Sequence, residues 1–314
     1  MPFRVLHPAT ASTPTPALWS ALLLSGALCL SGCSLLPRAD EPATGDTRSD
    51  IAGPEASSGA PSFDVVVRAP DAVRETLERH LELQRFRQLP DLQANELQRL
   101  LGATDANARE LLGTLGYFAP TITVELTEAQ ETAGTRKGAP RTVTVTVEPG
   151  PQTRIARADI TVAGTDEADK ETLARRQQRL QRNWSLAPGQ PFTQSAWDNA
   201  KNDGLRQLQA RRYPTARIAN SRAEIDADRH EAQLGVSYDP GPAYRFGPLR
   251  VQGTQRYDSD GARRLARLPT GAVYDEAEML DAQLRLASSG YYDAVFLTLD
   301  TEGTDPQAAP VVAQ

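Results

Sequence analysis

The chain has 314 residues and a formal net charge of −6, which argues against general nucleic-acid binding, because that requires a basic footprint. Its length leaves room for two or three domains. Both cysteines, Cys29 and Cys33, stand near the N-terminus, so the body of the chain offers neither a disulfide nor a thiol metal site. The three histidines are scattered, and we expect no metal and no cofactor.

Residues 1–32 are predicted to be a signal peptide. The apolar run Ala17–Leu30 has 14 residues, fewer than the roughly 20 that a spanning helix needs. It leads into Leu30-Ser-Gly-Cys33, which resembles the bacterial lipobox and implies lipidation of Cys33. Ser34 after this cysteine is typical of lipoproteins sent to the outer membrane. The alternative is a plain signal peptide cut nearby, with Cys33 incidental.

Residues 33–62 are predicted to be a flexible linker. They are rich in Ala, Pro, Ser, Gly, Asp and Thr and show no apolar periodicity. Such a linker would let the folded part stand away from a membrane surface.

The first predicted domain covers residues 63–151. Period-two alternation and helical spacing of apolar residues predict its elements. Asp71 is the expected N-cap of the first helix, and Gly116 is expected to end the second helical region. The elements are a strand at 63–67, helices at 71–83 and within 95–115, and strands at 121–126 and 141–148.

The second and third predicted domains, residues 152–242 and 243–314, repeat this order. Thr193 and Asp275 are the expected N-caps of their second helices, and the helix after Asp275 has Leu280 and Leu284 among its apolar positions. The third domain is expected to be truncated, with its last strand barely begun at Gln314. The elements of the second are 156–164, 170–183, 193–211, 216–223 and 231–238, and those of the third are 246–253, 259–266, the helix from 275 and 294–299.

Two similar stretches join these domains. Each is an alternating strand, an acidic residue, Pro-Gly-Pro, an arginine beside an apolar residue, and a second strand that ends at glycine. Pro-Gly-Pro forces a turn, because proline fixes φ and glycine adopts permissive dihedrals. We interpret both as interdomain corners, formed by Pro149, Gly150, Pro151, Pro240, Gly241 and Pro242.

The result is an α+β chain of three tandem β-α-α-β-β units. This order, with Gly-Tyr or its counterpart after the second helix and Val-x-Gly after the first strand, resembles POTRA (polypeptide-transport-associated) domains. The stretches Ala216–Asp226, His230–Leu234 and Gly241–Gly247 resemble TamA-like members of the BamA-like outer-membrane assembly factor family. The resemblance implies small mixed three-stranded sheets with two helices on one face. The membrane barrel with which that family continues is absent from this sequence, and we therefore interpret the chain as a fragment.

The resemblance also implies where partners bind. In POTRA domains the second strand of each unit lies at a sheet edge, whose free N–H and C=O groups can pair with an incoming strand. Arg217 and Arg222 would in addition steer acidic partners. The alternative is that each edge is solvated or capped. The edge residues expected to bind are Thr121, Ile122, Val124, Ala216, Arg217, Ile218, Arg222, Val295, Phe296 and Leu297.

The partners implied by the resemblance are unfolded outer-membrane protein clients, a TamB-like inner-membrane protein and the outer membrane, with the chain on its periplasmic side. No catalytic motif is found, so we expect no enzyme. Two alternatives remain open: a lipid-anchored periplasmic binding module that stands alone, and the POTRA region of a two-partner secretion transporter. The basic run Arg175–Arg182 would be a solvated helix face or would meet lipid headgroups or an acidic partner.

Overall fold

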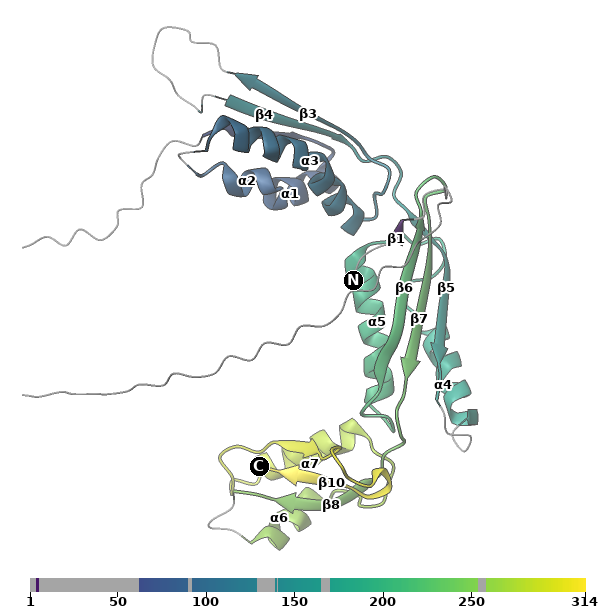
Figure 1. The fold of residues 1–314 in the computed structure, drawn as a ribbon. Coiled ribbons are helices and arrows are strands. Elements are labelled where there is room, and N and C mark those ends of the chain that lie inside the picture. The colour runs from purple at the N-terminus through teal and green to yellow at the C-terminus, as the bar shows by residue number, and fades with distance from the viewer. Residues whose placement is uncertain are drawn as a thin grey trace, which may run out of the picture. The chain divides into compact units, whose positions relative to one another are not determined.

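The computed structural model describes residues 4–5, 62–89, 92–128, 139, 141–164, 170–253 and 258–314. Cys33, nearly all of the predicted signal peptide and the predicted linker up to residue 61 lie outside these residues. The described part forms three repeats of the order β-α-α-β-β, of which the first has one additional short helix, and they are called repeats 1, 2 and 3 below (Figure 1). Each is a mixed three-stranded sheet with helices on one face, which confirms the predicted α+β fold.

Repeat 1 has the strand order β2-β4-β3. Its central strand β4 pairs in parallel with β2 and antiparallel with β3. Alternate residues of β4 (Val143, Val145 and Val147) are buried against the helices, as period two requires. The elements are β2 (Asp64–Arg68), α1 (Asp71–His80), α2 (Glu82–Phe86), α3 (Ala94–Thr114), β3 (Thr121–Glu128) and β4 (Arg141–Glu148).

The first helix of repeat 1 departs from prediction in two ways. Asp71 is its first helical residue rather than its N-cap, and Pro70 stands at the cap position. Proline suits the start of a helix because its fixed φ is already helical and its missing N–H is not needed there. The helix then ends at His80, since Leu81 is extended, with ψ 133°, and a separate short helix α2 follows.

The three strands of repeat 2 have the order β6-β7-β5, with β7 between the other two, and the two-residue strand β1 (Arg4–Val5) is added beside β6. Thr193 caps α5 as predicted, because its hydroxyl accepts the N–H of Ala196 at 3.1 Å. Helix α4 packs on β5 and α5 packs on β6. The elements are β5 (Arg154–Val162), α4 (Lys170–Arg182), α5 (Gln194–Gln209), β6 (Arg217–Asp226) and β7 (Glu231–Asp239).

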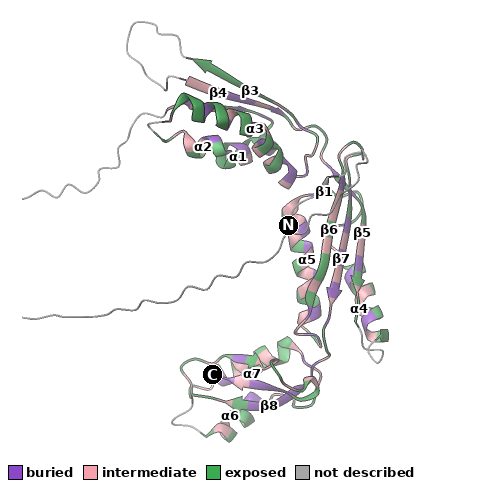
Figure 2. Ribbon diagram, viewed as in Figure 1, coloured by how far each residue is buried: buried purple, intermediate pink, exposed green. Residues whose placement is uncertain are grey.

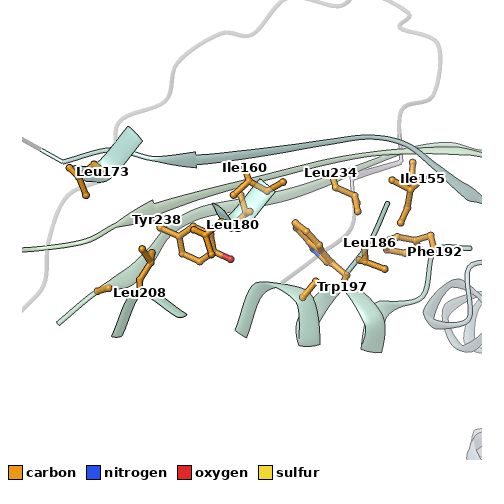
Figure 3. Close-up of a cluster of buried hydrophobic side chains, with 14 of the residues drawn as sticks. Ile155, Ile160, Leu173, Leu180, Leu186, Phe192, Trp197, Leu208, Leu234 and Tyr238 are labelled. Carbon is orange, nitrogen blue, oxygen red and sulfur yellow. The ribbon is translucent and has the colours of Figure 1, made fainter. Parts of the chain in front are cut away.

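The core of repeat 2 lies between its sheet and both helices (Figure 3). Trp197 is buried, and its ring meets the edge of Trp184 with centroids 6.2 Å apart. Tyr238 is fully buried, yet its hydroxyl donates to the carbonyl of Lys201 at 2.9 Å. Burial raises the pKa of Tyr238. These aromatic residues therefore serve packing.

Repeat 3 has the order β8-β10-β9. Asp275 caps α7 through the N–H of Ala277 at 3.1 Å, as predicted. The last strand, β10, has five residues and pairs with both neighbours, whereas β4 and β7 have eight and nine. The elements are β8 (Phe246–Val251), α6 (Ser259–Ala266), α7 (Glu276–Ala287), β9 (Leu297–Leu299), a 3-10 turn (Pro306–Ala308) and β10 (Ala309–Ala313).

Two predictions for repeat 3 need correction. The strand expected at 294–299 begins only at Leu297. Leu280 and Leu284 do not face the core, for they are 48% and 63% exposed, and α7 buries Ala282 and Leu286 instead. A short sheet leaves room for one narrow helix face. None of the described helices is long and apolar enough to cross a membrane.

Candidate functional site

The outer side of β3 is an open sheet edge of eight residues. All eight residues of β3 pair with β4 on one side, and no described strand lies on the other. Figure 2 shows that the strand is mostly exposed. Thr121, Ile122 and Val124 all lie in this strand. Free backbone groups along such an edge are a template for another strand.

The edge of repeat 2, β6, is partly occupied. Arg4–Val5, called β1, pairs in parallel with Glu224 and Ile225. Ala216 lies before β6, and both its backbone groups are used: its N–H donates to Tyr213 at 3.0 Å and its carbonyl accepts from Gln209 at 2.8 Å.

The predicted steering arginines of β6, Arg217 and Arg222, have carboxylate neighbours. Arg217 bonds Asp239 across the strands at 2.7 Å, and this bond holds the pKa of the Asp239 carboxyl below its usual value, helped by the Gly241 N–H. Arg222 lies 3.6 Å from Glu224. These arginines therefore carry less free charge than their sequence positions indicate, whereas Ile218, in the same strand, is half-buried.

The edge of repeat 3 is short and partly capped. Phe296 precedes β9, and its N–H and C=O pair with Gln314 at 3.0 Å, which extends the ladder between β9 and β10 by one residue pair. The N–H of Leu297 donates to the side-chain oxygen of Gln283 at 3.0 Å. Val295 lies outside the strand and borders a hollow of about 570 Å³ whose lining has one carboxylate, that of Asp293. Of the three expected edges, β3 alone is long and has no described strand along its outer side, where alternate residues present their backbone N–H and C=O groups.

Hydrogen bonds at the first corner join repeat 1 to repeat 2. The N–H of Thr153 donates to the carbonyl of Gly116 at 2.8 Å, and the Phe192 N–H donates to the Thr153 carbonyl at 2.8 Å. The side-chain amide of Gln152 also donates to the Leu115 carbonyl at 2.8 Å. The bonds thus link the end of α3 with the loop before α5.

The second corner repeats this pattern in equivalent residues. The N–H of Tyr244 donates to the carbonyl of Arg212 at 2.8 Å, and the Tyr274 N–H donates to the Tyr244 carbonyl at 3.0 Å. Arg212 also donates its N–H to Tyr274 at 2.9 Å. Tyr274 is buried, which raises the pKa of its hydroxyl to about 12, with Glu276 and Asp275 adding to the effect.

The arginine that follows each corner, Arg154 or Arg245, binds a neighbouring loop. Arg154 donates from its guanidinium to the carbonyl of Gly189 at 2.7 Å, and Arg245 donates in the same way to Gly271 at 2.9 Å. Each guanidinium therefore fastens the glycine loop that precedes the second helix. The periodic Arg-plus-apolar pair was the signal for this contact.

The Pro-Gly-Pro residues themselves turn the chain. Gly150 and Gly241 have φ of 70° and 65°, in the left-handed region that favours glycine. The residues of both corners are exposed or half-buried except Pro240, which is buried. The bonds between repeats are made two residues later, at Thr153 and Tyr244, which the sequence analysis missed. The complete set of corner residues is Pro149, Gly150, Pro151, Pro240, Gly241 and Pro242.

The turn between β6 and β7 is stabilised by the side chain of Asp226. Asp226, which begins the turn between β6 and β7, accepts the N–H groups of Asp228 and Arg229 at 3.1 and 3.0 Å, so it is a turn residue. Within the described residues, no group of three or more His, Cys, Asp or Glu is placed to hold a metal ion.

Two family models match the chain. Residues 67–149 match the POTRA domain described as TamA domain 1, and residues 244–311 match a POTRA model described as surface antigen variable number repeat. These matches fall on repeats 1 and 3. Repeat 2 has the same strand order and the same corner bonds.

Solved structures of similar fold include POTRA3-5 of BamA from Haemophilus influenzae, at 18% identity and TM-score 0.45, covering 81% of this chain and 95% of that chain. BamA from Haemophilus ducreyi lacking POTRA domains 1-3 matches at 19% identity and TM-score 0.38, and the match covers 49% of this chain and 28% of that chain. CdiB from Acinetobacter baumannii matches at 13% identity and TM-score 0.26, and the match covers 52% of this chain and 30% of that chain. At these scores the likenesses carry no argument beyond the two family models.

POTRA domains are non-catalytic assembly or transport modules and form the periplasmic part of outer-membrane Omp85-family proteins. Repeat 1 is similar to the POTRA domain described as TamA domain 1, repeat 3 is similar to a second POTRA model, and repeat 2 shares their strand order and corner bonds.

Proposed function

We propose that this chain is the periplasmic arm of a TamA-like outer-membrane assembly factor, and that it binds unfolded outer-membrane protein clients, or a TamB-like inner-membrane partner, by strand pairing at β3. The observation that carries the proposal is the free outer side of this eight-residue strand. Main-chain pairing is largely independent of side-chain identity, so one edge can accept many clients. POTRA domains of the Omp85 family bind unfolded clients and partners, which supports this role.

The β1–β6 pair supports the same mode at the second repeat. It is a strand of two residues added to the edge of β6. If the leader is cleaved before Cys33, as the lipobox-like sequence predicts, Glu224 and Ile225 become free for a client. Lipidation of Cys33 would then hold the arm at the outer membrane, with residues 34–62 as the tether.

Site-specific photo-crosslinking tests the proposal. A benzoylphenylalanine at Glu125, exposed in β3, is compared with one at Glu110, exposed on α3 of the same repeat. The probe is an outer-membrane β-barrel polypeptide diluted from urea. We expect an adduct at Glu125 and little at Glu110. Equal adducts at both positions, or an adduct at Glu110 alone, would refute pairing at β3.

A further inference from the structure

Strand β3 has a different chemistry on each of its two faces. Ile122 and Val124 pack against the buried cluster of repeat 1, and Leu126, on the same face, is 40% exposed. Because side chains alternate along a strand, the residues between them point to the outer face of the sheet. These outward residues are all exposed, and they are Thr121, Thr123, Glu125 and Thr127.

The pairing register extends both rows across the sheet. On the helix side, Val124 stands opposite Val145 of the central strand β4, which is fully buried. On the outer side, Glu125 stands opposite Thr144 of β4, and Thr144 stands opposite Val66 of β2. A strand added along the free side of β3 would therefore continue an apolar row on one face and a polar row on the other.

The outer face of this sheet carries more negative than positive charge. Its charged residues are Asp64, Glu125, Glu148 and Arg68. Of the four outward residues of β3, Glu125 is the charged one, and it lies near the middle of the strand. A neighbour directly opposite or diagonal to it on an added strand would lie within about 5 to 8 Å, so a long basic side chain there reaches its carboxylate.

We propose that β3 selects strands that are apolar on one face and carry lysine or arginine in the middle of the other face, with Glu125 as the residue that sets this preference. The inference rests on the proposed pairing at β3 and adds a side-chain preference to it. The apolar face of the added strand would lie beside Leu126 and Val124 and remove apolar surface from water. An acidic side chain in the middle of the polar face would be repelled by Glu125.

A second copy of the chain is a poor occupant of this edge. Antiparallel pairing of two β3 strands about their middle would place the two Glu125 side chains opposite each other or on a diagonal. Like charges across a strand pair are destabilising. A strand with a basic residue at this place gains an attraction instead, so charge complementarity favours a client strand over self-association.

Peptide binding to the full chain tests the preference. Three fluorescein-labelled peptides, each about as long as β3, alternate threonine with valine. They differ in the central residue of the threonine face, which is lysine, glutamine or glutamate. We expect the lysine peptide to bind about fivefold more tightly than the glutamate peptide, with glutamine between them, because exposed charges across a strand pair interact weakly. Salt at about 1 M should reduce this difference to less than about twofold.

Charge variants of the chain identify the residue responsible. Glu125→Lys should reverse the order of the peptides, and Glu125→Gln should bring the lysine and glutamate peptides within about twofold of each other. The matched control is Glu110→Lys, which makes the same change of charge at an exposed position of α3 and should keep the wild-type order. Equal binding of the lysine and glutamate peptides by wild type, or the wild-type order in Glu125→Lys, would overturn the preference.

A fourth peptide separates this preference from the proposed pairing. It has the lysine sequence with methylated backbone nitrogens, which removes the N–H donors that strand pairing requires. Main-chain pairing predicts that it binds at least about tenfold more weakly than the unmethylated peptide. Equal binding of these two, or no binding by any peptide, would refute both the pairing at β3 and the preference. A loss on methylation without an order among the other three would refute the preference alone.

Discussion

The two corners of the chain use the same hydrogen bonds with different residues. At the first corner the carbonyl that accepts the bond belongs to Gly116, with φ 90°, and at the second it belongs to Arg212, with φ 74°. Both positions require left-handed backbone, which glycine adopts freely and arginine does not. The two positions also differ in the space available to a side chain. Gly116 has none, because a Cβ there would lie 2.0 Å from the carbonyl oxygen of Phe192.

The two corners therefore share a left-handed residue at the same position, but a different residue type adopts this backbone conformation at each corner. At the first corner close approach of two backbones makes glycine necessary. At the second the arginine side chain extends over the Tyr213 ring, and this contact offsets part of the backbone strain. The predictions below test how far the two corners are equivalent.

The largest effect is expected at the first corner. Gly116→Ala should destabilise repeat 2 by about 3 kcal/mol, from left-handed strain together with overlap on the Phe192 carbonyl. Urea unfolding followed by tryptophan fluorescence measures it in residues 60–314, where both tryptophans, Trp184 and Trp197, lie in repeat 2. The control is Gly189→Ala, also left-handed at φ 86° but with open space around it, which should cost about 1 kcal/mol. Equal costs would show that the close approach relaxes.

The cap residues beside the corners come next. Asp275→Ala should cost about 1 kcal/mol, because it removes both the cap on Ala277 and the ion pair with Arg211. Asp275→Asn keeps a capping oxygen and should cost less than about 0.5 kcal/mol. Thermal unfolding followed by circular dichroism distinguishes them. If both variants lose the same amount, the ion pair rather than the cap is the larger contribution.

Replacing Arg212 with glycine gives the second corner the residue type that the first corner has at Gly116. We expect Arg212→Gly to be more stable than Arg212→Ala by about 1 kcal/mol, since both lose the contact with Tyr213 and only glycine relieves the left-handed strain. The same fluorescence-detected urea unfolding applies. A more stable alanine variant would contradict the strain at this position.

The smallest effect on stability is expected from the exposed ion pair between Arg217 and Asp239, at a position where repeat 1 has no ion pair. Arg217 faces Asp239 across β6 and β7, where repeat 1 has Thr121 facing Glu148. Because the pKa of Asp239 is lowered on folding, its stabilisation is present above the unfolded pKa of about 3.9 and is lost as pH falls through the folded value. Arg217→Gln should therefore lose less stability than wild type on acidification below about pH 4.

At neutral pH the cost of Arg217→Gln should stay below about 1 kcal/mol, because the pair is exposed and screened. Urea unfolding at a series of pH values measures both the free energy of unfolding at neutral pH and its change on acidification. Identical pH dependence in variant and wild type would show that Arg217 does not set the Asp239 pKa.

The local sequence predicted much of the fold, for local reasons. Thr193 and Asp275 were identified as caps because a short polar oxygen before an apolar-periodic stretch satisfies free N–H groups wherever it occurs. The strand at 141–148 was predicted correctly from alternation alone. The helix expected from 71 to 83 was wrong, since apolar periodicity continues through Leu81 although its backbone is extended.

The candidate edges show where such reasoning stops. The sequence identified the second strand of each repeat as the candidate edge. It could not show that Gln283 accepts the N–H of Leu297, or that the backbone groups of Ala216 bond to Gln209 and Tyr213. Nor could it show that no described strand pairs with the outer side of β3. These bonds join residues whose distance in space is set by helix packing. Likewise, Leu280 and Leu284 follow helical spacing, yet α7 turns them outward because repeat 3 has only a narrow core.

The sequence by itself determined the threefold β-α-α-β-β order, the corners and the helix caps, because each depends on residues a few positions apart. Only the tertiary structure decided which sheet edge is open, why Arg212 adopts a glycine-like backbone, and that Arg176 of α4 lies over the ring of Tyr213. Each of these depends on contacts between groups from separate elements, which no local sequence pattern records.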